Sequence, residues 1–312
     1  MNKEVVIIMG YNAAGKTTYT EKYTSLGYTR LNRDLADGTI DDLATKAGQL
    51  LGNGVDRIVL DNTYPSVASR ASVIKAAKAH KAKITCVHVT TSLEESQMNA
   101  CLRMIRKYGH LPSPEEIKSL KDPNTFPPAA LFHYRKQYQE PSTKEGFDKI
   151  EEIEFIRKWG PEYKYKALIV DYDGTLRESK GPQKYPMMPS EIEMLPGRTD
   201  VLNTYKEDGY FLLGASNQSG IARGSVTQEA VVGVFEETNR LIGVNIEYNF
   251  CPHPSNPVMC YCRKPQCGMG AVFIEKYKLN PSDCIMVGDM TTDESFARRC
   301  GFNYVDQKDF FN

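Results

Sequence analysis

The first half of the chain takes its fold from the stretch Gly10-Tyr11-Asn12-Ala13-Ala14-Gly15-Lys16-Thr17, which follows the apolar run 5–9 and precedes a helix-like segment. Glycines in such a loop let the backbone curl so that successive N–H groups point at phosphate oxygens. The lysine then reaches the β and γ phosphates, and the next hydroxyl ligates Mg²⁺. We predict a nucleotide site with the contacts Gly10, Gly15, Lys16, Thr17 and Thr18, in which Lys16 is catalytic and Thr17 binds the metal.

A second phosphate-handling signature stands in the other half, in the order Asp171-Tyr172-Asp173-Gly174-Thr175. It ends the apolar run 167–170, so two carboxylates are expected at the end of a strand. A carboxylate held by Mg²⁺ can attack a phosphoryl group, and a second carboxyl can protonate the leaving alkoxide and then deprotonate water. We predict Asp171 as the nucleophile and Asp173 as the acid and base. Taken alone, the motif also fits an acidic turn.

Three later segments supply the other groups that this chemistry needs. Residues 214–218 end an apolar run and offer hydroxyl and amide groups, and Lys264 supplies a cation to neutralise the phosphoryl group. Asp289, together with Asp293, closes a further apolar run and adds carboxylates for Mg²⁺. The predicted substrate contacts are Thr175, Ser216 and Asn217, the predicted Mg²⁺ ligands are Asp171, Asp173 and Asp289, and Lys264 is predicted to be catalytic.

Four soft metal ligands fall within a dozen residues, in the order Cys251, His253, Cys260 and Cys262. This spacing suits a tetrahedral structural Zn²⁺ site with no position left open for catalysis, and incidental buried thiols are the alternative. Lys264 follows the last ligand closely, so the metal would fix the loop that presents it. The remaining cysteines are scattered, which favours a reduced, cytoplasmic compartment.

Length and pattern together indicate two domains. Strand-like runs alternate with helix-like segments up to residue 157, and the alternation restarts after residues 155–163. This order indicates parallel sheets with helices on both faces and active residues at the carboxyl ends of the strands. The predicted fold class is α/β, with two doubly wound parallel-sheet domains at 1–157 and 165–312. The predicted strands cover residues 5–9, 57–60, 84–89, 167–170, 211–215, 284–287 and 303–305.

The amino-acid composition indicates which kinds of binding partner the protein can have. The 312 residues are 41% hydrophobic and 25% charged, and their formal net charge is zero. Proteins that grip long nucleic acid show a basic excess, so any nucleic-acid contact is expected to be local, at a strand end or a few nucleotides. The sequence contains no apolar run near the roughly 18 residues of a membrane helix, and the N-terminal run is too short for a signal peptide.

Transfer of phosphate to an alcohol needs a group that accepts the hydroxyl proton. Asp34, in the segment Leu31-Asn32-Arg33-Asp34, is the predicted base, and Asp61 at a strand end either binds the metal's water shell or orients the loop. Either residue is alternatively a helix cap. The Pro-rich segment 110–128 is either a mobile lid or a surface loop.

The segments GYNAAGKTT, LNRD, VLDNTYPSVASR and YRKQYQEPSTKEGFDKIEEIEF resemble the kinase module of the polynucleotide 5′-kinase/3′-phosphatases over residues 5–155. The resemblance implies that Asp34 activates a 5′-hydroxyl, that Arg33 positions the acceptor strand and that Arg70 lies near the substrate phosphates. It also implies a nucleotide-binding lid arginine, Arg103. Cys101 stands where another arginine is expected, and Arg106 is its possible substitute.

The second half resembles the haloacid-dehalogenase phosphatase superfamily in the order of four segments, which are residues 171–175, 214–218, 263–265 and 287–293. With SNQSGIARG, CRKPQCGMG and the cysteine-histidine loop, residues 168–301 look most like the histidinol-phosphate and heptose-bisphosphate phosphatases. The two halves therefore point to different substrates, nucleic-acid ends for the first and small phosphate esters for the second.

The preferred hypothesis is an end-healing enzyme that uses ATP, Mg²⁺ and a structural Zn²⁺. It would phosphorylate 5′-hydroxyl ends of DNA or RNA and remove 3′-phosphates, in the same pathway as a ligase. The alternative is a kinase and phosphatase pair acting on small sugar or nucleoside phosphates. A nucleotide-gated binding protein with a degenerate phosphatase is a third reading, which the intact Lys16, Asp171, Asp173 and Asp289 oppose.

Overall fold

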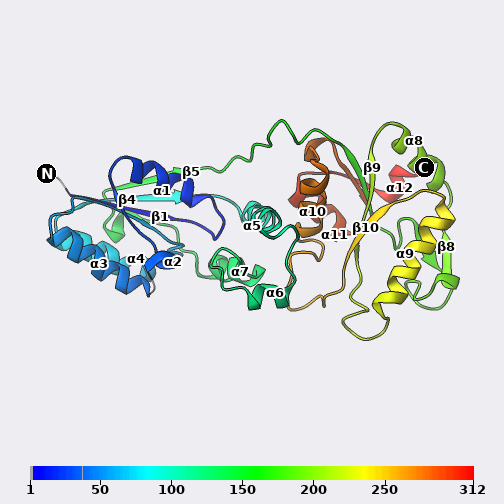
Figure 1. Ribbon diagram of the computed structural model, residues 1–312, viewed down its shortest axis with the longest axis horizontal. Coiled ribbons are helices and arrows are strands. Elements are labelled where there is room, and N and C mark those ends of the chain that lie inside the picture. Colours follow the sequence, from blue (N-terminus) through cyan, green and yellow to red (C-terminus); the bar gives the residue numbers. More distant parts are fainter. Residues whose placement is uncertain (1–2, 37) are drawn as a thin grey trace. The chain divides into compact units, whose positions relative to one another are not determined.

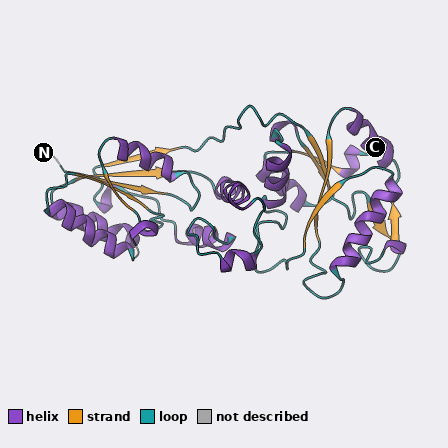
Figure 2. Ribbon diagram, in the orientation of Figure 1, coloured by secondary structure: helices purple, strands orange, loops and turns teal. Residues whose placement is uncertain are grey.

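The computed structural model describes residues 3–36 and 38–312. The chain divides into two compact units. Unit 1 comprises Met1–Ala100 and Lys121–Arg157, and unit 2 comprises Cys101–Leu120 and Lys158–Asn312. Figure 1 labels the helices and strands, and Figure 2 shows that both units combine a sheet with helices.

Unit 1 contains a five-stranded sheet in the order β2-β3-β1-β4-β5, and every neighbouring pair is parallel. Its strands are β1 (Glu4–Met9), β2 (Thr29–Leu31), β3 (Arg57–Asp61), β4 (Lys83–Val89) and β5 (Lys149–Ile153). Its helices are α1 (Lys16–Ser25), α2 (Arg33–Ala36), α3 (Ile40–Gly52), α4 (Val67–Ala79) and α7 (Pro128–Gln137). Because parallel strands run in the same direction, the carboxyl ends of β1, β2 and β3 lie at the same edge of the sheet.

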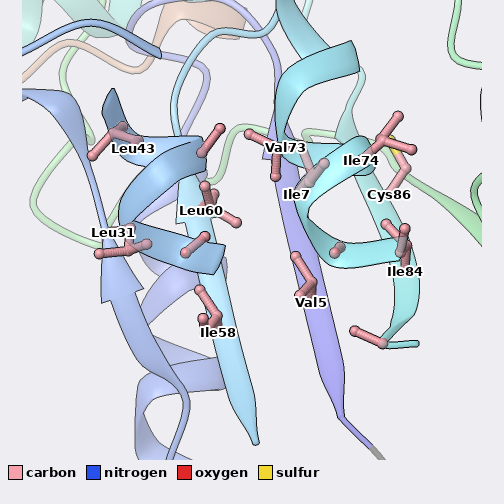
Figure 3. Close-up of a cluster of buried hydrophobic side chains, with 14 of the residues drawn as sticks. Val5, Ile7, Leu31, Leu43, Ile58, Leu60, Val73, Ile74, Ile84 and Cys86 are labelled. Carbon is pink, nitrogen blue, oxygen red and sulfur yellow. The ribbon is translucent and has the colours of Figure 1, made fainter. Parts of the chain in front are cut away.

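The core of unit 1 follows from the alternation of side chains along β1. Val5 and Ile7 pack on one face with Leu43 of α3 and Val73 of α4, as Figure 3 shows. Val6 and Ile8 are buried on the opposite face, in a cluster with Ala14 and tyrosines of α1. A strand buried on both faces reads as a continuous apolar run, which is why the sequence predicted β1.

Helix α5 (Leu93–Tyr108) begins in unit 1, and its last part groups with unit 2. In unit 2, Arg106 donates to the Tyr163 hydroxyl at 2.8 Å and to Glu275 at 3.2 Å. The Leu111 side chain lies 2.8 Å from where a Cβ on Gly268 would stand. The division at 1–157 and 165–312 stays a prediction, and in the structure Cys101–Leu120 packs with the second half.

The Pro-rich segment carries a short helix, α6 (Pro114–Ser119). The Ser113 hydroxyl accepts from the backbone N–H of Glu116, and the Glu116 carboxylate accepts from the N–H of Ser113. This reciprocal capping box stabilises the first turn of the helix.

Unit 2 repeats the architecture, with strand order β10-β9-β6-β11-β12 and parallel neighbours throughout. Its strands are β6 (Ala167–Val170), β9 (Phe211–Asn217), β10 (Glu247–Cys251), β11 (Ile285–Gly288) and β12 (Asn303–Asp306), and β7 (Arg177–Ser179) and β8 (Ile192–Met194) form an antiparallel hairpin. Its helices are α8 (Arg198–Glu207), α9 (Gln228–Ile242), α10 (Gly268–Tyr277), α11 (Thr291–Cys300) and α12 (Gln307–Phe310). The predicted fold class, with two parallel-sheet α/β domains, is confirmed.

Among the described residues, no helix is long and apolar enough to cross a membrane.

Replacing Leu60 with alanine should destabilise unit 1. Leu60 is fully buried between the sheet and its covering helices, so Leu60→Ala should lower the free energy of unfolding by about 2–5 kcal/mol. Urea unfolding followed by circular dichroism measures the loss. Leu26→Ala, at a leucine that is 55% exposed, is the matched control, and an equal loss in both variants would contradict the assigned core.

Candidate active sites

The loop that joins β1 to α1 has the backbone that a phosphate cradle needs. Gly10 has φ +148° and Gly15 has φ +89°, values that side chains rarely adopt. A Cβ on Gly10 would lie 2.8 Å from the carbonyl oxygen of Val89, so this position requires glycine. Gly15 stands directly before α1, whose first N–H groups favour an anion at the loop.

Lys16 is held over this loop. Its Nζ donates to the carbonyl oxygens of Gly10 at 3.1 Å and of Tyr11 at 2.6 Å. Thr17 and Thr18 follow in the first turn of α1, and both are exposed. The structure therefore gathers the predicted nucleotide contacts of this segment at one loop, with a cation and two exposed hydroxyls.

Two polar side chains outside the motif brace the loop. The Thr91 hydroxyl donates to the carbonyl oxygen of Ala14 at 2.8 Å, and the Asn99 amide donates to that of Ala13 at 2.9 Å. Ala13 itself has φ +59°, a conformation that costs free energy and needs such support. Neither residue is recognisable from the sequence, because neither belongs to a short motif.

The predicted acceptor residues Arg33 and Asp34 open α2 and are both exposed. Buried Asn32 orients them, because its amide donates to the Asp61 carbonyl oxygen and its side-chain oxygen accepts from the N–H of Asp34 at 2.7 Å. The Asp61 carboxylate pairs with Arg30 and is buried. Asp34 thus has the accessible carboxylate, and Asp61 secures the end of β3.

Arg70 does not lie where the resemblance implied. Its side chain is fully buried and donates to both carboxylate oxygens of Glu145, at 2.7 and 2.8 Å. The remaining donors reach the carbonyl oxygens of Tyr64 and Gln139. A fully buried guanidinium whose three nitrogens each donate within unit 1 has no accessible surface for a substrate phosphate, so Arg70 is a structural residue and its predicted substrate contact is corrected.

The two predicted lid arginines lie on the part of α5 that groups with unit 2. Arg106 donates hydrogen bonds to Tyr163 and Glu275. Burial lowers the pKa of Arg106, but Glu275 and Tyr163 together raise it by more, so its pKa is raised overall. Arg103 is half-buried, and its nucleotide contact stays a prediction.

The second site centres on a buried ammonium. The Nζ of Lys264 lies 2.9 Å from a carboxylate oxygen of Asp171 and 2.6 Å from one of Asp293, and it donates to the Ala215 carbonyl oxygen at 2.6 Å. Asp171 follows β6, and Asp293 lies in the first turn of α11. The predicted nucleophile and the predicted cation are thus in direct contact.

Asp171, Asp289 and Asp293 each place a carboxylate oxygen within 4.8 Å of the others. Burial raises the pKa of Asp171 to about 7, with a lowering effect from Lys264 and raising effects from Asp293 and Asp173. Burial, and then Asp293, also raise the pKa of Asp289. Carboxylates whose ionisation is disfavoured by burial and by one another are stabilised by a divalent cation, so this donor set fits Mg²⁺.

The carboxylate of Asp173 is not part of that group. Arg177 Nε donates to its Oδ1 at 2.9 Å, and Gln218 Nε2 donates to its Oδ2 at 3.0 Å. The Asp173 carboxylate therefore lies outside the acidic group that could hold a metal ion, which comprises Asp171, Asp289 and Asp293, and its Mg²⁺ contact stays a prediction. Its position leaves Asp173 available for proton transfer.

The three predicted substrate contacts of unit 2 have different surroundings. Buried Ser216 follows Ala215 at the end of β9 and accepts from Gln218 at 3.0 Å. The Asn217 amide donates to the Lys264 carbonyl oxygen and accepts from the Lys264 N–H, both at 2.9 Å, so it holds the loop, and its substrate contact stays a prediction. Thr175 is fully buried, and its hydroxyl makes no hydrogen bond among the described residues, so its substrate contact stays a prediction.

The four cysteine and histidine ligands converge. Cys251 Sγ lies 3.6 Å from Cys260 Sγ and 3.5 Å from His253 Nδ1, which lies 3.2 Å from Cys262 Sγ. Tetrahedral Zn²⁺, with bonds of about 2.0–2.3 Å, separates such ligand atoms by about 3.5–3.8 Å. Two of the three separations lie in this range and the third is 0.3 Å shorter than its lower limit, so the four side chains are close enough together to hold one metal ion.

Comparison with known families agrees with these two sites. The AAA domain model matches residues 5–104, and the HAD-hydrolase-like model matches residues 261–305. The chain therefore joins a P-loop kinase-type unit to a haloacid-dehalogenase-like phosphatase unit.

Individual relatives refine this class. The D-glycero-β-D-manno-heptose-1,7-bisphosphate 7-phosphatase of Haemophilus influenzae is 34% identical over 137 residues, which are 41% of this chain and 73% of that protein. Through this relationship the chain belongs to the heptose-bisphosphate phosphatase family of haloacid-dehalogenase-like enzymes.

The resemblance to polynucleotide kinase/phosphatases is also confirmed. The bifunctional polynucleotide phosphatase/kinase of Schizosaccharomyces pombe is 26% identical over 155 residues, which are 49% of this chain and 34% of that protein. One chain in the structure of the Pnkp1/Rnl/Hen1 RNA repair complex is similar over 98% of this chain and 96% of its own length, at 16% identity and a TM-score of 0.33.

Removing the Arg70 side-chain charge should destabilise unit 1. Arg70→Met leaves the Glu145 carboxylate buried without its cation, which should lower the free energy of unfolding by about 3–5 kcal/mol. Chemical denaturation measures the change. Arg33→Met removes an exposed arginine of the same unit and should leave stability within about 0.5 kcal/mol, and a stable Arg70→Met variant would contradict the structural role.

Proposed function

We propose that this protein heals nucleic-acid ends, phosphorylating 5′-hydroxyl ends of DNA or RNA with ATP and removing 3′-phosphates. The observation that carries the proposal is the presence in one chain of a nucleotide-phosphate loop and an aspartate-lysine phosphatase centre. Together these activities convert an end with both faults into one that a ligase can join. The similarity to the Schizosaccharomyces pombe enzyme supports this substrate class.

In the kinase reaction the loop backbone and Lys16 would hold the β and γ phosphates of ATP, and the Thr17 hydroxyl would be a ligand of Mg²⁺. Asp34, exposed in the first turn of α2, accepts the proton of the 5′-hydroxyl as that oxygen attacks the γ phosphorus. Exposed Arg33 beside it binds the phosphate backbone of the acceptor strand.

In the phosphatase reaction the Asp171 carboxylate attacks the phosphorus and forms an aspartyl-phosphate. Asp171, Asp289 and Asp293 would hold Mg²⁺, which supplies positive charge to the transferring phosphoryl group when bound. Lys264 neutralises the same group, and Ser216 donates a hydrogen bond to a phosphoryl oxygen. Asp173 protonates the leaving oxygen and then accepts a proton from water.

The cysteine-histidine set would hold structural Zn²⁺. Lys264 stands two residues after Cys262, so a metal-fixed loop keeps the ammonium beside Asp171. A zero formal net charge fits contact with strand ends instead of long duplexes. We place the protein in the cytoplasm, in a pathway with a ligase.

The identity to the Haemophilus influenzae heptose-bisphosphate phosphatase favours a second candidate. In that case the phosphatase acts on small sugar phosphates, and the kinase serves a related small molecule.

One oligonucleotide with a 5′-hydroxyl and a 3′-phosphate tests the proposal. With ATP and Mg²⁺, mass spectrometry should show one phosphate gained at the 5′ end and one lost at the 3′ end. A phosphate gained at the 5′ end without loss of the 3′-phosphate would favour small phosphate esters as phosphatase substrates. An oligonucleotide unchanged at both ends would refute end healing.

The two activities should be separable. Lys16→Ala should lower the kinase rate by about 100-fold or more because it removes phosphate-binding charge. Asp171→Ala should lower the phosphatase rate at least about a thousandfold because it removes the nucleophile. Each variant should keep the other activity, and the exposed substitutions Lys22→Ala and Asp208→Ala should change neither. Loss of both activities from either change would contradict two independent sites.

Zinc removal should affect the phosphatase first. Cys260→Ser should lower bound zinc, measured by elemental analysis, and should reduce the phosphatase kcat by about tenfold or more while the kinase persists. Cys284→Ser, outside the ligand set, is the control. An unchanged phosphatase rate in protein verified as zinc-free would contradict the role of the metal in placing Lys264.

A further inference from the structure

The carboxylate of Asp173 is held at both of its oxygens. Oδ1 accepts from Arg177 Nε at 2.9 Å, and Oδ2 accepts from Gln218 Nε2 at 3.0 Å. Two donors from separate segments leave the carboxylate plane little freedom to rotate. Such fixed orientation matters for a group that must meet a leaving oxygen at hydrogen-bond distance.

Arg177 is itself immobilised. It is 1% exposed, donates to the carbonyl oxygen of Val234 at 2.8 Å and to the Thr238 hydroxyl, and stacks on aromatic rings. The guanidinium carbon lies 5.0 Å from the ring centre of Tyr172 and 4.9 Å from that of Phe235. A buried cation needs a counter-charge, and Asp173 supplies it.

Gln218 joins Asp173 to the phosphate-binding hydroxyl. The same Nε2 also donates to Ser216 Oγ at 3.0 Å. The Asp173 carboxylate fixes the orientation of the Gln218 amide, because the flipped amide would place its oxygen, an acceptor, against the acceptor Oδ2 of Asp173. Since Ser216 Oγ accepts from the amide, its own O–H is free to donate toward the phosphoryl group.

We propose that Arg177 and Gln218 are positioning residues that hold Asp173 for proton transfer to the leaving oxygen of an alkyl phosphomonoester. The inference rests on the proposed phosphatase activity and deepens it. Alkoxides depart only when protonated, whereas p-nitrophenolate departs without a proton. The network is needed for the first kind of substrate and dispensable for the second.

The protons balance over two steps. Asp173 first takes up a proton from solvent, while Arg177 continues to donate to its Oδ1. In the first step, an Asp171 oxygen bonds to phosphorus, the bond from phosphorus to the alcohol oxygen breaks, and the Asp173 carboxyl gives that proton to the alcohol oxygen. In the second, water bonds to phosphorus, the aspartyl-phosphate bond breaks, and the water proton passes to Asp173. The products are the alcohol and inorganic phosphate, and Asp171 and Asp173 return to their starting states.

The test compares two substrates by kcat/KM, which reports steps only as far as departure of the leaving group. One substrate is thymidine 3′-phosphate, an alkyl ester, and the other is p-nitrophenyl phosphate. Gln218→Met keeps the side-chain length and removes the donor, at a half-buried residue. It should lower kcat/KM for the alkyl ester by about 10- to 100-fold and for p-nitrophenyl phosphate by less than about threefold.

Arg177→Lys provides the second variant, since it keeps the charge but lacks the Nε donor, and it should show the same selective loss. Arg198→Met is the matched control. Arg198 is another partly buried arginine of unit 2, and its Nε donates to the Thr175 carbonyl oxygen at 3.0 Å, away from Asp173. It should leave the ratio of the two kcat/KM values unchanged.

Three outcomes decide the question. Selective loss with the alkyl ester supports the positioning role. Equal loss with both substrates in Gln218→Met, at an unchanged unfolding midpoint, overturns it while leaving the phosphatase assignment intact. An unmodified protein that hydrolyses neither ester overturns the phosphatase assignment and the inference together.

Discussion

The buried contact of the Lys264 ammonium with the Asp171 and Asp293 carboxylates is the constraint around which unit 2 is organised. A buried charge without a partner costs several kcal/mol, so the folded state is stable only when all three charged groups lie in contact. The loop after Cys262 is therefore tied to β9 through Asn217, and α11 must begin where Asp293 can turn inward. The same requirement explains why a metal-fixed loop beside Lys264 would serve catalysis.

The predicted phosphate site of unit 1 depends on backbone groups more than on charged side chains. Its phosphate cradle uses N–H groups at a helix start and needs few charged side chains, so glycines and supporting hydrogen bonds decide its shape. Thr91 and Asn99 hold the loop from neighbouring segments. In both units the reacting groups stand at the carboxyl ends of parallel strands, where loops are free to vary without disturbing the sheet.

Predictions from the sequence succeeded where burial leaves a local pattern. The central strands β1, β3, β4, β6, β9 and β11 are apolar runs, because both faces of a central parallel strand are covered. The edge strands β2, β5 and β10 were missed. Lys149–Ile153 reads KIEEI and is partly exposed, so its pairing with β4 is visible only in the folded sheet.

The sequence alone determined the phosphate-binding loop, the nucleophile motif and the metal-ligand spacing, because each lies within a few consecutive residues whose chemistry is local. Tertiary structure decided which charges meet. The sequence indicated that Arg70 is a substrate ligand, whereas in the structure it pairs with Glu145, which lies 75 residues away in the chain. Lys264 reaches Asp171 across 93 residues, and Asp173 depends on Gln218 from another strand end. Contacts between distant segments leave no local pattern, since only packing brings the side chains together and removes water from between them.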